Sequence, residues 1–78
     1  MTPYKNLNGG SGIYAYETSN TEIAVQFING DLYLYNNISA GNYNIEHMKK
    51  LAIDGKGLNS FINTTVRKKY YSKINTKS

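Results

Sequence analysis

The Asn29-Gly30 pair constrains the fold of this chain more than any other feature of the sequence. It separates two runs of strand-favouring residues, at 23–28 and 31–35. An Asn-Gly pair flanked by two such runs is the strongest short-range signal for a β-hairpin. The sequence therefore predicts a hairpin at the centre of the fold.

The register of this hairpin decides what its two tyrosines do. With a two-residue loop, Tyr33 lies opposite Gln26. With a three-residue loop that ends at Gly30 in the left-handed conformation, Tyr33 lies opposite Val25. Because a shift of one residue moves every side chain to the other face of the sheet, Tyr33 and Tyr35 are either core residues or a solvent-facing stacking platform. The residues alone leave both registers open.

A third strand is predicted at residues 13–16, before the hairpin. Apolar residues at helical spacing predict one helix from Asn42 or Asn44 to about Asp54, which ends at Gly55. A second helix is predicted from about Asn59 to Lys73, with Asn63 as an alternative N-cap. The expected fold class is therefore α+β, a three-stranded antiparallel meander followed by two C-terminal helices packed on one face.

The length of 78 residues suits one domain. Residues 1–12 contain Gly9, Gly10 and Gly12 without strand or helix periodicity, which predicts a flexible N-terminal arm. The domain itself is expected over residues 13–74, and residues 75–78 are expected to form a disordered tail.

Charge is distributed unevenly along the chain, which carries a formal net charge of +4. The residues up to His47 include one lysine against four acidic residues, whereas those from Met48 onward include eight basic residues against one aspartate. This asymmetry favours an anionic partner for the C-terminal half. A solvated helix face with a basic tail explains the same pattern equally well.

Several functional classes have little support in the sequence. The chain has no cysteine and a single histidine, His47, so neither a thiolate site nor a metal centre is expected, and no cofactor is predicted. No nucleophile–base pair stands out, so we expect the protein not to be an enzyme. The sequence also shows no apolar run of membrane-spanning length and no signal-peptide region, so we expect a cytoplasmic protein without a membrane partner.

A set of motifs in a fixed order resembles the KTSC domain, a small domain named after the C-terminal extension of some lysyl-tRNA synthetases and also found as stand-alone bacterial and phage proteins. The resemblance spans residues 11–71. The motifs are Ser11-x-Ile13, Tyr16, Ile23-x-Val25-x-Phe27, Gly30, Tyr33-x-Tyr35, Ile38, Tyr43, and Phe61-Ile62-Asn63-x-x-Val66-Arg67-x-x-Tyr70.

The resemblance has consequences for both register and function. The family usually carries a polar residue where Leu34 stands here, which implies inward-facing tyrosines and favours the three-residue loop. It also usually has a proline at the position of Ser39, and the linker over residues 54–59 is longer here. The attachment to a synthetase implies RNA binding.

Two functional hypotheses follow. The first is a non-enzymatic module that binds RNA or a phosphate-bearing nucleotide through the basic helix and nearby tyrosines. The second is a small protein-interaction module, such as a phage-type inhibitor of a host or defence protein, with exposed tyrosines as hot spots. The open sheet face that carries Leu32 and Leu34 is a candidate surface for self-association. The candidate ligand-binding residues are Tyr33, Tyr35, Lys56, Asn63, Arg67, Lys68, Lys69 and Tyr70.

Overall fold

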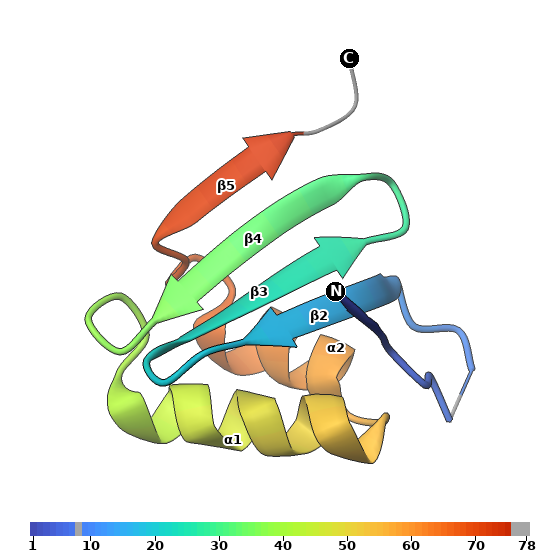
Figure 1. Cartoon of the computed structure of the whole chain (residues 1–78), viewed down its shortest axis with the longest axis horizontal. Coiled ribbons are helices and arrows are strands. Elements are labelled where there is room, and N and C mark those ends of the chain that lie inside the picture. Colours follow the sequence, from blue (N-terminus) through green and yellow to red (C-terminus); the bar gives the residue numbers. More distant parts are fainter. Residues whose placement is uncertain (8, 76–78) are drawn as a thin grey trace.

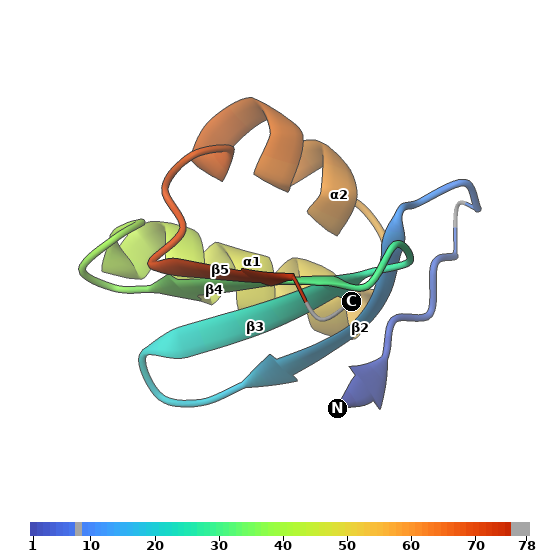
Figure 2. The same cartoon turned by 90° about the horizontal axis from the view of Figure 1, so that it is seen from above.

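The computed structural model describes residues 1–7 and 9–75 of the chain. Within that part, an antiparallel sheet of five strands, in chain order, packs against helices that cover one of its faces (Figures 1 and 2). The strands are β1 (Thr2–Pro3), β2 (Ile13–Thr18), β3 (Glu22–Phe27), β4 (Asp31–Asn36) and β5 (Ser72–Asn75). The helices are α1 (Asn42–Asp54), α2 (Leu58–Phe61) and its π-helical continuation η1 (Ile62–Val66). The α+β class is confirmed, and the predicted three-stranded meander forms the centre of a wider sheet.

The hairpin of β3 and β4 adopts the register of the three-residue loop. Val25 pairs with Tyr33 and Ile23 pairs with Tyr35. Gly30 has a φ of 98°, and its N–H donates a hydrogen bond of 2.9 Å to the carbonyl of Phe27. A side chain would be strained at this φ, so glycine is what allows the loop to close in this register.

The core lies between the helices and the face of the sheet that carries Tyr35. Alternate residues of the hairpin point the other way, because Leu32 pairs with Gln26 and Leu34 pairs with Ala24 on the uncovered face. The prediction that the two leucines lie opposite the tyrosines is therefore confirmed. The core consists of Tyr4, Ile13, Ile23, Val25, Tyr35, Ala40, Ile45, Met48, Ala52, Leu58, Ile62 and Val66.

The N-terminal segment is packed against the domain over residues 2–7. β1 pairs with β2, and Tyr4 is buried with its hydroxyl accepting a 3.4 Å hydrogen bond from the N–H of Leu58. The N–H of Leu7 donates to the carbonyl of Gly55 at 2.7 Å. A two-residue strand and a single buried tyrosine leave no periodic signal, which is why the sequence suggested a flexible arm here.

The first helix lies where the sequence placed it. α1 begins at Asn42, after Gly41, and the side-chain amide of Asn44 donates to the carbonyl of Ala40 instead of capping an N–H group. Gly55 ends the helix in the left-handed conformation, with a φ of 79°. The predicted glycine stop is therefore confirmed.

The second helix is shorter than predicted, and the strand that follows it was missed. The helix begins at Leu58 and ends at Val66, so Asn63 lies inside it and is not its N-cap. The hydroxyl of Thr64 donates a hydrogen bond to the carbonyl of Ser60 at 2.9 Å. Side-chain bonds of this kind compete with the backbone hydrogen bonds of a helix, which is one reason why threonine is a poor helix former. The chain then turns back and pairs as β5 with the otherwise free edge of β4.

The predicted tail at 75–78 falls almost entirely outside the described residues; Asn75 ends β5. None of the helices among the described residues has both the length and the apolar character needed to cross a membrane.

Candidate functional site

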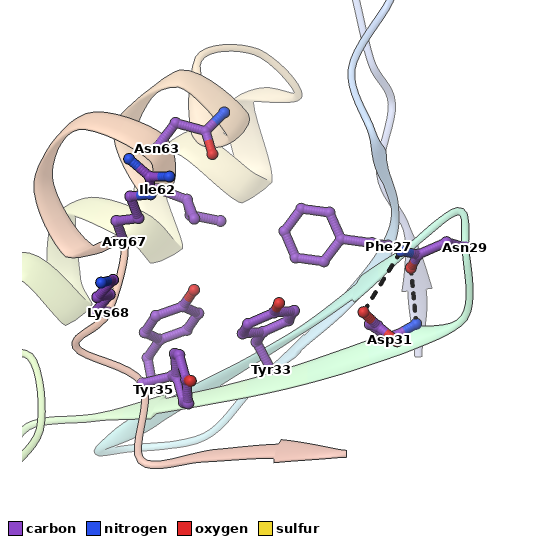
Figure 3. Close-up of a pocket in the computed structure, with 10 residues that line it drawn as sticks. Phe27, Asn29, Asp31, Tyr33, Tyr35, Ile62, Asn63, Arg67 and Lys68 are labelled. Carbon is purple, nitrogen blue, oxygen red and sulfur yellow. Dashed lines mark hydrogen bonds between the residues drawn. The ribbon is translucent and has the colours of Figure 1, made fainter. Parts of the chain in front are cut away.

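A cavity of about 340 Å³ lies between the sheet on one side and η1 with the turn after it on the other (Figure 3). The hairpin supplies one wall, and η1 with the turn after it supplies the other. The lining residues are Phe27, Asn29, Asp31, Tyr33, Tyr35, Ile62, Asn63, Arg67, Lys68 and Tyr70. This cavity is the candidate functional site.

The sheet wall is an aromatic cluster centred on Tyr33. Its ring meets Phe27 edge-on at a centroid distance of 5.3 Å and Tyr70 edge-on at 5.2 Å, and it lies nearly parallel to Tyr35 at 6.4 Å. Such contacts are typical of packed aromatic rings. Tyr33 and Tyr35 are therefore packing residues whose hydroxyls face the cavity, whereas Tyr70, which is 37% exposed, keeps ring surface available for stacking.

The hydroxyl of Tyr35 is the most informative polar group in the cavity. The residue is only 1% exposed, yet its hydroxyl has no hydrogen-bond partner among the described residues and points into the cavity (Figure 3). Burial, followed by electrostatic interaction with Tyr33 and Tyr70, raises the pKa of Tyr35 well above its ordinary value. At neutral pH the group is therefore an uncharged donor with a free proton.

The helix wall carries the positive charge. Arg67 and Lys68 come directly after η1, and Asn63 lies one turn earlier on the same side of the helix. Neither cation forms an ion pair with the described part of the chain, although two lysines of α1 do. Both are exposed, so they are available to an anionic ligand at the cavity mouth.

Asp31 closes the hairpin end of the cavity. Its N–H donates to Oδ1 of Asn29 at 2.9 Å, and Nδ2 of Asn29 donates back to Oδ2 of Asp31 at 3.5 Å. This exchange fixes the side chains of the loop that also contains Gly30. Neither Asn29 nor Asp31 was among the predicted site residues, although the Asn-x-Asp spacing around Gly30 is a readable turn signal.

Lys73 is a third cation at the edge of the site. The pairing of β5 with β4 places it beside Tyr33, with Nζ 5.3 Å from the ring centroid. A hydrogen bond with the Tyr33 hydroxyl, followed by electrostatic interaction with Tyr33 and Asp31, raises the pKa of Lys73. Lys73 was predicted to lie at the end of a helix, and only the pairing of β5 with β4 brings it to this position.

Comparison of the chain with protein-family models, curated protein sequences and solved structures gives no match. The resemblance to the KTSC domain therefore stays a prediction.

Of the eight predicted site residues, six line this cavity and two do not. Lys56 instead borders a second, smaller cavity of about 190 Å³, next to the N-terminal segment. Lys69 borders neither cavity; its N–H closes the turn after η1 by donating to the carbonyl of Val66 at 2.8 Å. In the predicted helix, the three consecutive cations Arg67, Lys68 and Lys69 spread over one exposed surface. In the structure, the turn after η1 separates Lys69 from the other two. The residues in the cavity are Tyr33, Tyr35, Asn63, Arg67, Lys68 and Tyr70.

His47 lies away from the cavity, against Tyr43 and Phe61 at centroid distances of 6.3 and 4.7 Å. Among the residues that the structure describes, there is no cluster of three or more side chains suited to a metal ion.

Proposed function

We propose that the chain is a non-enzymatic module that binds RNA or another phosphate-bearing nucleotide in the cavity between β4 and η1. The observation that carries the proposal is the hydroxyl of Tyr35, which has no hydrogen-bond partner in the described structure and is open to a cavity that Arg67 and Lys68 border. The ring is held in the core while its hydroxyl faces the cavity, so a ligand in the cavity can accept the hydrogen bond that no protein group accepts.

The other groups suit the same kind of ligand. Arg67 can bind a phosphate with two parallel hydrogen bonds, and Lys68 can contribute a point charge. The exposed ring surface of Tyr70 can stack on a base, a contact worth about 1–3 kcal/mol. The amide of Asn63 can both donate and accept hydrogen bonds.

The lining of the cavity supports binding more than turnover. It includes a single carboxylate, Asp31, and no serine, threonine or histidine that could form a nucleophile–base pair. We therefore propose no reaction for this site.

A matched pair of lysine variants tests the proposal. Binding of a fluorescently labelled single-stranded RNA is measured by anisotropy at low and moderate salt. Lys68→Ala should weaken binding and reduce the slope of log K against log salt by about one, because it removes one phosphate contact. Lys69→Ala changes the charge equally one residue further on, outside the cavity, and should have a much smaller effect.

Two results would count against the site. Equal losses in both variants would indicate nonspecific attraction to a basic surface. No binding of RNA or nucleotide at low salt would favour the alternative function.

That alternative is a protein-interaction module, including self-association. The uncovered face of the sheet supports it, because Leu32 pairs there with Ile74, which is 43% exposed, and Leu34 lies beside them. A phage-type inhibitor of a host or defence protein is one form that such a module would take. Sedimentation of the wild-type chain and of Leu34→Lys tests self-association through this face.

A further inference from the structure

The cavity has two chemically different ends. Arg67 and Lys68 stand at the η1 end, and Asp31 stands at the hairpin end, with Tyr33 and Tyr35 between them (Figure 3). A ligand that spans the cavity therefore meets cations at one end and a carboxylate at the other. A simple anion would use only one of them.

The carboxylate of Asp31 is positioned but not saturated. Its Oδ2 accepts one long hydrogen bond from Asn29, and its Oδ1 accepts none within the described structure. It also forms no ion pair there, although Lys73 lies close enough for Asp31 to help raise its pKa. An ionised carboxylate only accepts hydrogen bonds, so this end of the cavity selects a ligand edge rich in N–H donors.

Among the common nucleobases, guanine fits such an edge best. Its Watson–Crick edge carries N1–H and the 2-amino group side by side, so two donors can meet the two carboxylate oxygens. Adenine and cytosine offer a single amino group beside an acceptor, and uracil offers one N–H between two acceptors. Charge-assisted hydrogen bonds are about twice as strong as neutral ones, so the second donor is a substantial gain.

Size restricts the ligand further. A volume of about 340 Å³ is at the lower end of the range for small-molecule sites. This volume suits one nucleotide unit. The unit can be a free mononucleotide or one unstacked residue of a single strand, and both present the same chemistry to the cavity.

We infer that the cavity binds one guanine nucleotide unit, with its phosphate at Arg67 and Lys68 and its Watson–Crick edge at Asp31. This inference rests on the proposed function. The hydroxyl of Tyr35 then donates to an acceptor of the bound unit, and Tyr70 covers the base.

A series of nucleotides tests the base assignment on the wild-type chain by calorimetric titration. Guanosine monophosphate should bind most tightly. Inosine monophosphate lacks only the 2-amino group and should bind on the order of 10-fold more weakly, the effect of one hydrogen bond to a charged group. Adenosine monophosphate should bind more weakly still. Equal affinity for all three would overturn the assignment of the guanine edge.

A variant of Asp31 gives a second, independent readout. Asp31→Asn offers one acceptor and one donor in place of two acceptors, so it should lose preference for guanosine monophosphate and gain preference for xanthosine monophosphate, whose edge carries one N–H beside a carbonyl. Asp54→Asn, a carboxylate on α1 that borders neither cavity, is the matched control and should leave the order unchanged. Unchanged selectivity in Asp31→Asn would overturn the inference.

Single-stranded oligonucleotides with one guanine or none separate the two sources of the unit. Tight binding of the guanine-containing strand together with weak binding of the mononucleotide identifies RNA as the source and keeps the inference. Binding of both strands with equal affinity overturns the inference but leaves the proposed function standing. No binding of any nucleotide or strand at low salt overturns both.

Discussion

The two walls of the cavity differ in how far their side chains are buried and how they are held in place. On the sheet wall, Tyr35 is 1% exposed and the ring of Tyr33 packs against three other aromatic rings. On the other wall, Arg67 and Lys68 are exposed and unpaired within the described structure. The first wall is part of the core, and its side chains are held by packing. The second is held by a short helix and a turn, so its side chains are free to respond to a ligand.

This difference separates stability from binding within one site. A substitution that truncates a packed ring of the sheet wall should change the free energy of unfolding first and binding only as a consequence. A substitution of Arg67 or Lys68 on the helix wall should change binding and leave stability nearly unaltered. Each prediction below tests one side of that contrast, from the largest effect to the smallest.

The largest effect is expected from Tyr35→Ala. Removing this buried ring should lower the free energy of unfolding by about 3–5 kcal/mol, as other large aromatic truncations in cores do. Tyr33→Ala should cost less, because Tyr33 is only half-buried. Urea denaturation followed by circular dichroism measures both. A Tyr35→Ala variant as stable as the wild type would show that this wall is not part of the core.

Gly55→Ala should be the next most damaging change, and it extends the contrast to the N-terminal segment. The φ of Gly55 is +79°, and an added Cβ would lie 2.6 Å from Cβ of Lys5. Gly57 has the same left-handed conformation with a φ of +84°, and an added Cβ there would meet only a side-chain carbon of Leu51 at 3.4 Å, so Gly57→Ala is a matched control for the conformational cost. That cost is about 1 kcal/mol, and Gly55→Ala should exceed it.

Equal melting temperatures for these two glycine variants would contradict the packing of residues 2–7 against the loop after α1.

The raised pKa of Tyr35 predicts a loss of stability at alkaline pH. The folded state keeps the hydroxyl protonated above the pH at which an unfolded tyrosine ionises, near 10. Stability from this group is therefore complete below about pH 10 and falls above it, by up to about 1.4 kcal/mol per pH unit. Tyr35→Phe should remove this contribution from the pH dependence. The same slope in both proteins would show that another group causes it.

The smallest effect on stability is expected on the uncovered face. Leu34→Lys should change the free energy of unfolding by less than about 1 kcal/mol, because this half-buried strand position packs against no helix. Thermal melts compare it directly with Tyr35→Ala. If Leu34→Lys unfolds the protein, the uncovered face contributes to stability more than the register indicates.

The sequence predicted the central hairpin and α1 well, because both depend on local signals. Asn29-Gly30, the glycine at 55 and the apolar spacing of α1 act over a few residues each. The hairpin register needed the additional assumption that Tyr33 and Tyr35 face inward. β1 and β5 were not predictable in this way, because β1 has two residues and β5 is defined by the free edge of β4 that it covers.

The residues of the candidate site also differ in whether local signals in the sequence predict them. Tyr33 and Tyr35 alternate on one strand, so local periodicity predicted that pair, whereas Asn63 and Arg67 were predicted together from the motif that resembles the KTSC domain. Asp31 and Lys73 belong to the site only through the loop conformation and the pairing of β5. The Asn-x-Asp spacing around Gly30 is a local signal for the position of Asp31, whereas the contact of Lys73 with Tyr33 depends on residues forty positions apart in the chain.

The most direct test of the account uses Tyr35→Phe, which keeps the packed ring and removes only the hydroxyl that faces the cavity. The measurement is the dissociation constant for a labelled guanine-containing single strand at low salt, with thermal stability measured on the same sample. The account predicts unchanged folding at neutral pH and binding several-fold to about 10-fold weaker than wild type, the effect of one lost hydrogen bond. Unchanged affinity in a folded Tyr35→Phe protein would contradict the claim that this cavity is the binding site.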